Sequence, residues 1–205
     1  MTAGLSTWLR ERIRLKKSKP IPAHMNFFYC FGGLSFSIIL LQLATGIFML
    51  FFYSPEPQEA LKSIESMSNE VVFGGLFRNM HRWASVILLA MVFSHMIMVF
   101  YYKAYRSPRE FTWFSGVVQL LVVFLFVVTG IILPWDWRAY WAFALWIDYI
   151  ETWPLIGEYF SHFILDGFSI NIGYFTHILI LPITLAVLLH FHFKMVRKHG
   201  ISEPL

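Results

Sequence analysis

Two pairs of histidines lie inside long apolar runs, and their spacing limits the folds open to this chain. His81 and His95 are fourteen residues apart in RNMHRWASVILLAMVFSH, and His177 and His192 are fifteen apart in THILILPITLAVLLHFH. Such steps rotate an α-helix by about −40° and about +60°, so each pair lies roughly on one helix face, about 21 to 23 Å apart along the axis. Two such helices side by side would form two facing pairs of histidines at two depths.

The apolar runs are long enough to cross a membrane. Residues 27–53 and 111–134 each exceed the span of about 20 residues that a hydrocarbon core requires. Of the 205 residues, 58% are hydrophobic and 14% are charged, whereas soluble domains average about 25% charged residues. We therefore expect an all-α membrane protein with a four-helix bundle of transmembrane helices at about 26–53, 72–105, 110–133 and 173–198. A loop at about 134–172, with one or two interfacial helices, would join the last two on the outer side.

The first 25 residues differ from the rest of the chain. The stretch LSTWLRERIRLKKSK places its apolar residues on one helical face and basic residues over most of the remainder. This pattern predicts an amphipathic helix lying at the interface of an anionic leaflet, and a disordered basic tail is the alternative. The chain thus divides into an interfacial helix at 1–25 and a four-helix domain at 26–205.

Lysine and arginine are distributed unequally between the two sides of this topology. Twelve lie before the first helix, between the second and third, and at the end of the fourth, whereas four lie on the opposite side. The positive-inside rule then puts both termini on the cytoplasmic (n) side, and the second and fourth helices run in the same direction. His81 would therefore face His177 at an outer level, and His95 would face His192 at an inner level. The net charge of +4 lies outside the apolar runs, so it reflects orientation in the lipid membrane and not binding to nucleic acid.

Four histidines at matched spacing favour two metal centres over four unrelated interhelical hydrogen bonds. An ionisable group in a transmembrane helix is costly unless it has a partner. No Cys, Asp or Glu lies near the four to complete a tetrahedral or mixed site, whereas a haem needs one imidazole on each face. We therefore expect two haems, one at each level. His190 is thirteen residues from His177, a rotation of about −140°, so we expect it to face away from them.

Two further sets of residues suit this arrangement. The fourteen-residue interval recurs between pairs of glycines, Gly32 with Gly46 in the first helix and Gly116 with Gly130 in the third. Each glycine would give a macrocycle room at one level, although helix packing is the alternative. Arg78 and Arg82 lie at the outer end of the second helix, where haem propionates or lipid phosphates would bind cations. Positions that merely snorkel to the surface are the alternative for these two arginines.

Five motifs resemble the cytochrome b6 family: NFFYCFGG (26–33), LFRNMHRW (76–83), SPREFTW (107–113), TGIILPWD (129–136) and MVRKHGISEPL (195–205). This family comprises the short cytochromes b of b6f-type and related bacterial quinol:cytochrome c oxidoreductases. The resemblance extends from about Pro22 onward, and the fifteen-residue interval of the fourth helix is the b6-type interval. It implies a catalytic subunit that carries electrons across the membrane, in a Q cycle, between an outer quinol-oxidising site and an inner quinone-reducing site.

The resemblance also implies cofactors. By matching position, the two histidine pairs would hold the outer and the inner haem b. Cys30 in YCFGG would hold a covalent haem c by one thioether bond, although without a CxxCH motif the sequence alone would make it an ordinary buried cysteine. Arg197 and Lys198 match residues near that third haem and the inner quinone pocket. The quinone would be menaquinone or plastoquinone.

The implied partners are a subunit IV-like membrane subunit that carries a PEWY segment, a Rieske iron–sulfur protein and a c-type cytochrome, in a homodimeric complex. The bacterial plasma membrane is the expected location, with a thylakoid membrane as the alternative. Ile172 and Met98 stand where the family usually has arginines that help to neutralise propionates. Two other functions remain open: a di-haem anchor relaying electrons between quinone and a peripheral oxidoreductase, and a non-redox transporter or assembly subunit.

Overall fold

The computed structural model describes Thr7, Arg10 and residues 27–200. The expected interfacial helix at 1–25 lies, apart from Thr7 and Arg10, outside the described residues. Within the described part the regular elements are all helical, and four helices are long and apolar enough to cross a membrane: Phe31–Leu50, Gly74–Tyr101, Glu110–Ile132 and Ile170–His199. The expected all-α architecture with four transmembrane helices is confirmed.

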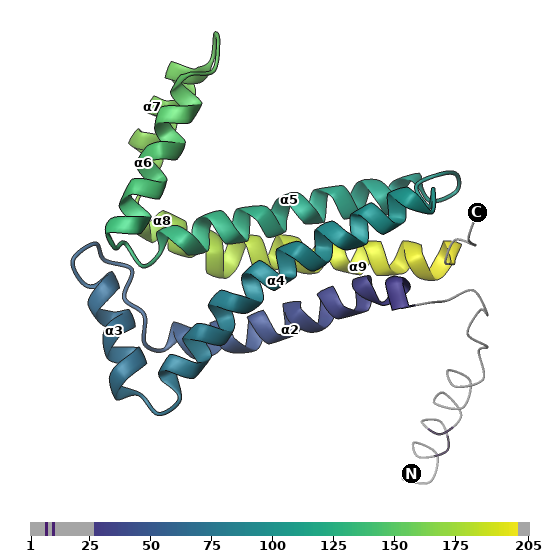
Figure 1. The fold of residues 1–205 in the computed structure, drawn as a ribbon, viewed down its shortest axis with the longest axis horizontal. Helices are drawn as coiled ribbons and strands as arrows, with labels where there is room; N and C mark the ends of the chain where they lie inside the picture. Colours follow the sequence, from purple (N-terminus) through teal and green to yellow (C-terminus); the bar gives the residue numbers. More distant parts are fainter. Residues whose placement is uncertain (1–6, 8–9, 11–26, 201–205) are drawn as a thin grey trace.

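The four spans lie side by side as a bundle (Figure 1). They are α2 (Phe31–Leu50), α4 (Gly74–Tyr101), α5 (Glu110–Ile132) and a fourth span that ends in α9 (Leu181–His199). The first span is shorter than the expected 26–53, because Phe27–Cys30 forms the 3-10 helix η1 and Phe51 ends α2. We call the end at the start of α2 and the end of α9 the inner end, and the opposite end the outer end.

The fourth span has three parts. It begins as α8 (Ile170–Phe175), continues as a π-helical segment, η2 (Thr176–Ile180), and ends as α9. Pro182 follows the π segment directly. Proline has no backbone N–H and its ring crowds the carbonyl four residues earlier, and membrane helices accommodate it by local widening of this kind. A π turn adds one residue to a helix, and such turns are frequent at functional sites.

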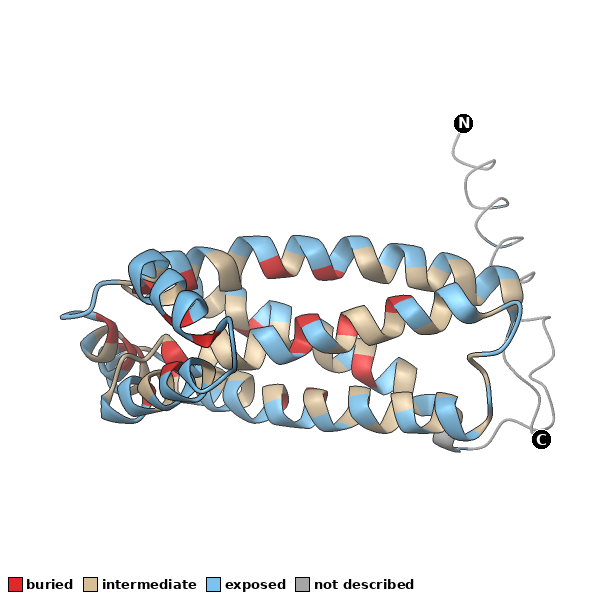
Figure 2. Ribbon diagram, turned by 90° about the horizontal axis from the view of Figure 1, so that it is seen from above, coloured by how far each residue is buried: buried red, intermediate tan, exposed pale blue. Residues whose placement is uncertain are grey.

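The bundle has little interior and a large apolar exterior. Buried residues lie along the inward sides of the helices, as Figure 2 shows, and one buried cluster joins Val122 of α5 to Leu181 and Leu185 of α9. Large apolar side chains cover the outside; Phe111, for example, is 75% exposed. In water such a surface would be unfavourable, whereas it suits hydrocarbon. The chain is an integral membrane protein.

Three shorter helices lie at the outer end. They are α3 (Ala60–Glu70), which packs on α4, and a hairpin of α6 (Trp137–Glu151) and α7 (Gly157–Gly167) that leaves the bundle sideways (Figure 1). Asp136 begins the hairpin, because its carboxylate accepts a hydrogen bond of 2.8 Å from the Ala139 N–H, a typical N-cap. The 134–172 region is thus mainly helical.

Side chains tie the helix ends together. At the outer end, the Tyr53 hydroxyl donates to the Leu133 carbonyl at 2.6 Å and so joins the end of α2 to the end of α5. At the inner end, Arg109 donates from Nε to the Gly200 carbonyl at 3.4 Å and from Nη2 to the His199 carbonyl at 3.5 Å. The start of α5 is therefore joined to the end of α9.

Candidate metal centres

The outer level brings together His81 from α4 and His177 from η2. Their ring centres lie 6.3 Å apart, with the ring planes inclined at 61°. Thr45 Oγ1 lies 2.9 Å from His81 Nδ1, and Thr129 Oγ1 lies 2.8 Å from His177 Nδ1. Each hydroxyl also donates to a carbonyl one turn back in its own helix, so its oxygen is left to accept the ring N–H. This pattern leaves Nε2 of each imidazole unprotonated and available to a metal ion.

At the inner level a hydroxyl contacts only one of the two histidines, His192. His192 Nδ1 lies 2.8 Å from Ser115 Oγ, which donates to the Thr112 carbonyl at 2.8 Å. The His95 ring of α4 lies against Gly32 of α2 at the same end of the bundle. No hydroxyl of the described residues faces the His95 ring within hydrogen-bond distance. The two inner imidazoles therefore have unequal surroundings.

Each of the four rings lies against a glycine of the neighbouring helix. A Cβ added at the glycine would come within 3.3 Å of the facing Cε1 for Gly46 and His81, 3.1 Å for Gly32 and His95, 3.1 Å for Gly130 and His177, and 3.5 Å for Gly116 and His192. The first three distances are tighter than an ordinary contact. The glycines thus lie at the expected levels, but what they directly make room for is the histidine rings.

The π segment explains how unequal intervals can serve the same two levels. The two histidines of α4 are fourteen residues apart, and those of the fourth span are fifteen apart. The π segment Thr176–Ile180 begins at the outer level, where it includes His177, and extends toward the inner level. Because a π turn accommodates one extra residue, fifteen residues on this side match fourteen on the other.

Sequence comparison gives the chain a family. The family model described as cytochrome b/b6/petB matches residues 16–200, which is most of the chain. This chain belongs to the cytochrome b/b6 family. Cytochrome b6 of Desmonostoc sp. (strain PCC 7906) is 38% identical over 214 residues, covering 99% of this chain and 100% of the relative. Cytochrome b6 of Mastigocladus laminosus is 37% identical, with the same coverage of both chains.

The fold comparison agrees with this membership of the cytochrome b/b6 family. A solved chain described as "Hyperthermophilic respiratory Complex III" is similar at a TM-score of 0.85 and 28% identity. The similarity covers 97% of this chain and 56% of that chain, so this chain spans little more than half of the solved chain's length.

Membership of the cytochrome b/b6 family implies b-type haem and quinone, and the geometry of the outer histidine pair fits such a haem. Two imidazole nitrogens, each about 2 Å from one metal ion, leave ring centres about 6 Å apart, as for His81 and His177. The described residues contain no group of three or more His, Cys, Asp or Glu able to hold a metal ion. Two axial imidazoles are what a bis-histidine haem requires.

The other residues predicted for the cofactors lie at the two ends of the bundle. Cys30 is exposed at the inner end, two residues before Gly32. Arg197 and Lys198 are exposed in the last turn of α9. At the outer end, Arg78 is half-buried and donates to Ser68 Oγ at 3.3 Å, whereas Arg82 is exposed. These residues are not in contact with the histidine rings.

Sequence reasoning missed the three hydroxyl partners. Thr45, Ser115 and Thr129 each stand directly before a site glycine, so the dipeptides Thr-Gly and Ser-Gly were the available signal. In a helix, adjacent residues point about 100° apart, so one glycine can face a ring edge while the residue before it reaches the ring nitrogen. The fourth site glycine is preceded by Phe31.

Sequence reasoning also missed three buried polar groups at the inner end. Thr112 Oγ1, Trp113 Nε1 and His199 Nδ1 are buried side-chain atoms for which the described residues provide no hydrogen-bond partner. They lie on neighbouring helix ends, because Arg109, in the turn before α5, contacts the His199 carbonyl. Buried polar atoms normally have partners, which can be water or a polar ligand.

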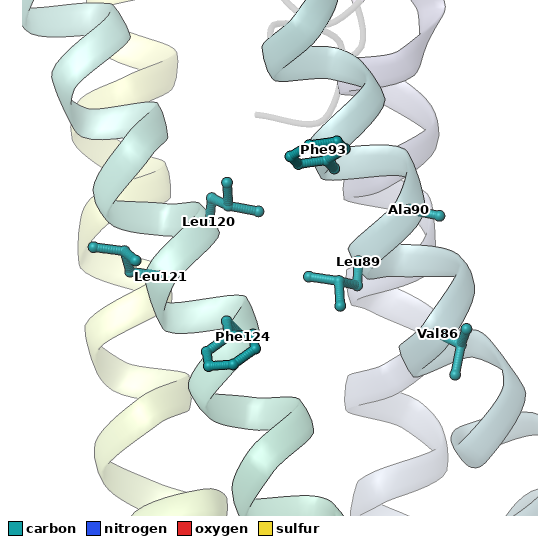
Figure 3. A pocket seen from close by; sticks show the side chains of 7 residues that line it. All are labelled: Val86, Leu89, Ala90, Phe93, Leu120, Leu121 and Phe124. Atoms are coloured by element: carbon teal, nitrogen blue, oxygen red, sulfur yellow. The ribbon is translucent and has the colours of Figure 1, made fainter. Parts of the chain in front are cut away.

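One apolar pocket opens between α4 and α5. It has a volume of about 530 Å³ and is lined by Val86, Leu89, Ala90, Phe93, Leu120, Leu121 and Phe124 (Figure 3). Every lining residue is apolar, and the α4 residues lie between the two histidine levels in sequence. The pocket therefore suits hydrocarbon and offers no group to bind a polar substrate.

Proposed function

We propose that this chain is the cytochrome b6-like subunit of a quinol:cytochrome c oxidoreductase complex. It would carry electrons across the membrane between an outer quinol-oxidising site and an inner quinone-reducing site. The observation that carries the proposal is the pairing of His81 with His177 at 6.3 Å, with a glycine against each ring. Membership of the cytochrome b/b6 family and the four apolar spans support it.

The four histidines would hold two haems b, one with His81 and His177 and one with His95 and His192. A haem so ligated supplies one-electron redox chemistry. The residues of the chain orient the ligands: Thr45, Thr129 and Ser115 accept the Nδ1–H of three rings and so direct Nε2 toward the iron. Gly32, Gly46 and Gly130 let three rings approach the neighbouring helices closely, and Gly116 faces the fourth ring at a distance that an added Cβ would fill.

Cys30 would hold a third, c-type haem at the inner end by one thioether bond. Its exposure and its place two residues from Gly32, at the level of His95, support this assignment. Arg197 and Lys198 would provide positive charge beside this haem and the inner quinone. Arg78 and Arg82 would bind propionates of the outer haem, and the half-buried position of Arg78 suits this role better than the exposed Arg82.

A quinone, menaquinone or plastoquinone, would bind at the inner end beside Cys30. Thr112 Oγ1, Trp113 Nε1 and His199 Nδ1 are buried and have no hydrogen-bond partner among the described residues, which supports a polar ligand there. A hydroxyl and a ring N–H can donate to a quinone oxygen, and the imidazole can transfer a proton.

The remaining parts of the enzyme would come from other proteins. We propose a PEWY-bearing subunit IV-like protein, a Rieske iron–sulfur protein and a c-type cytochrome as partners, in a homodimeric complex. The excess of lysine and arginine at the inner end supports termini on the n side of a bacterial plasma membrane.

Haem analysis of the purified complex tests the proposal. A pyridine haemochrome spectrum should show b-type haem in this subunit, and its absence would favour a transporter or assembly role. Haem that stays attached to this subunit after acid–acetone extraction and separation of the subunits supports the b6-like function over a di-haem anchor. Cys30→Ala should abolish the retained haem and keep both b haems; unchanged retention would refute the role of Cys30.

A further inference from the structure

One exposed face of α9 is apolar in one half and polar or cationic in the other. Ile183, Val187, His190, Lys194 and Arg197 recur at intervals of three or four residues, so they share one side of the helix. All five are exposed. The face is apolar toward the middle of the bundle and polar or cationic toward the inner end, although His190 and Lys194 still lie within the span Ile170–His199.

Neither His190 nor Lys194 is explained by the metal centres. His192 is bonded to Ser115, whereas His190 lies about 200° away around the helix from His192. Lys194 points away from the bundle and is exposed. Charged and polar side chains in a membrane span are costly, and they normally meet a partner. A lysine stem can also reach toward the headgroups while its methylene groups stay in hydrocarbon.

The described residues offer Lys194 no anion. Within 27–200 the one ion pair joins Lys62 to Glu59 at the outer end. Glu110 is the one acidic residue of the inner end in the same range, and it forms no ion pair with Lys194. Within residues 27–200, therefore, no negative charge complements this face.

A second copy of the chain does not complement this face. Two copies related by a twofold axis along the membrane normal present the same residues to each other at the same depth. A dimer with this face on its axis would place Lys194 against Lys194, and like charges repel. A phospholipid has the matching layout, because its phosphate lies at the depth of the last turns of the helix and its acyl chains run toward the membrane centre.

We propose that this face binds one anionic phospholipid. Lys194 and Arg197 bind its phosphodiester, His190 donates a hydrogen bond to a headgroup or ester oxygen, and one acyl chain lies along Ile183 and Val187. Arg197 donates Nε to the Phe193 carbonyl at 3.2 Å, which leaves its remaining N–H groups for the phosphate. Lys194 and His190 have no role in the haem assignments, whereas Arg197, proposed above for the third haem, is shared with the phosphate.

Lipid binding to the purified complex tests this site. The complex is delipidated by detergent exchange and titrated with phosphatidylglycerol or with phosphatidylcholine, and bound lipid is counted by native mass spectrometry. Phosphatidylglycerol should bind more tightly than phosphatidylcholine. Lys194→Leu should weaken phosphatidylglycerol binding about fivefold, the effect of one cation near a membrane surface, and leave phosphatidylcholine binding unchanged. Lys194→Arg should keep the preference.

Arg106→Leu is the matched control, because it removes an exposed cation from the inner end but not from α9. Equal binding of the two lipids by the unmodified complex would overturn the proposal, and this comparison requires no variant. Equal weakening by Arg106→Leu and Lys194→Leu would reduce the effect to general surface charge and would also overturn it. Loss of the dimer in Lys194→Leu, with unchanged lipid binding, would assign the face to a second copy.

Discussion

The hydroxyl oxygen of Thr45 lies 2.9 Å from His81 Nδ1 and 2.8 Å from the carbonyl of Leu41 in its own helix. The carbonyl can only accept, so the hydroxyl hydrogen goes to Leu41 and the ring N–H goes to Thr45. One residue of α2 thus fixes both the orientation and the tautomer of a histidine on α4. Thr129 and Ser115 do the same for two other rings.

Thr45→Val should weaken the outer haem site, because it removes the hydrogen bond and keeps the shape of the side chain. Loss of such an outer partner typically lowers metal affinity about 10- to 100-fold. Haem retained during purification and the midpoint potential of the outer haem measure the effect. Thr184→Val on the exposed side of α9 is the control and should change neither. Unaltered retention and potential in Thr45→Val would show that this hydrogen bond does not support the site.

His177→Leu should remove the outer haem and leave the inner one, since one axial ligand of one pair is lost. The measurement is haem b per protein by pyridine haemochrome, together with a redox titration that should lose one of two components. His190→Leu is the matched control on the same span, and it should keep both components because His190 is exposed and turned away. Loss of a haem in His190→Leu would mean that the ligand of the inner level is wrongly assigned.

Gly32→Val and Gly33→Val form a matched pair at adjacent positions of α2. A Cβ at Gly32 would come 3.1 Å from His95 Cε1, whereas a Cβ at Gly33 meets nothing within 4 Å. Both changes carry a similar helix propensity, so the difference between them reports the contact. Gly32→Val should lose the inner haem b, and Gly33→Val should retain it. Equal haem content in the two variants would contradict the role of Gly32.

Deleting Leu179 should be tolerated better than deleting Val187. The first deletion falls in the π segment and turns fifteen residues between the histidines into fourteen in a regular helix. The second falls in the regular helix α9 and turns His192 by about 100° relative to His177. Optical spectra should therefore show both haems after deletion of Leu179 and loss of the inner haem after deletion of Val187. The reverse order would mean that the π segment does not set the spacing.

Tyr53→Phe tests the link between α2 and α5 and its dependence on pH. Burial, with a smaller effect of Tyr174, raises the pKa of the Tyr53 hydroxyl above its usual value of about 10. The folded protein then holds this proton more tightly than the unfolded chain, so the stability it contributes is present below about pH 10 and is lost as pH rises above that value.

At neutral pH the variant should lose about 1 kcal/mol of stability with the hydrogen bond to Leu133. Above about pH 10 the difference between the two proteins should narrow, because Tyr53→Phe has no proton to lose. The apparent melting temperature in detergent, followed against pH, measures both effects. A difference that stays constant with pH would show that Tyr53 does not titrate with unfolding.

The spans could be predicted from the sequence because long apolar runs report directly on a hydrocarbon environment. The pairing of the histidines at two levels could also be predicted, because the distribution of lysine and arginine sets the direction of each helix. The π segment could not be predicted, because the apolar residues of Thr176–Ile180 suit an α-helix equally well. The two intervals differ by one residue in the sequence, but only the structure places the extra residue in Thr176–Ile180.

The hydroxyl partners precede three of the four site glycines in the sequence. Their role as hydrogen-bond acceptors for the histidines depends on which helices pack against each other, which the sequence does not state. The pairs Thr45–Gly46 and Thr129–Gly130 gain a role only once α2 lies on α4 and α5 lies on α9. The helix start at Phe31 was missed for a local reason. Residues 27–30 form a tighter 3-10 turn that an apolar pattern does not distinguish from the first turn of an α-helix.

Phe31 is the exception to the pattern in which a hydroxyl residue precedes each site glycine, and it lies at the inner level. It stands before Gly32, where the other site glycines follow a hydroxyl, so His95 has no such acceptor for its ring N–H among the described residues. An imidazole without that acceptor is a weaker electron donor to iron, which favours the reduced state of its centre. In the proposed electron path, a single aromatic residue in the first turn of α2 would thus make transfer from the outer to the inner haem energetically downhill and set its direction.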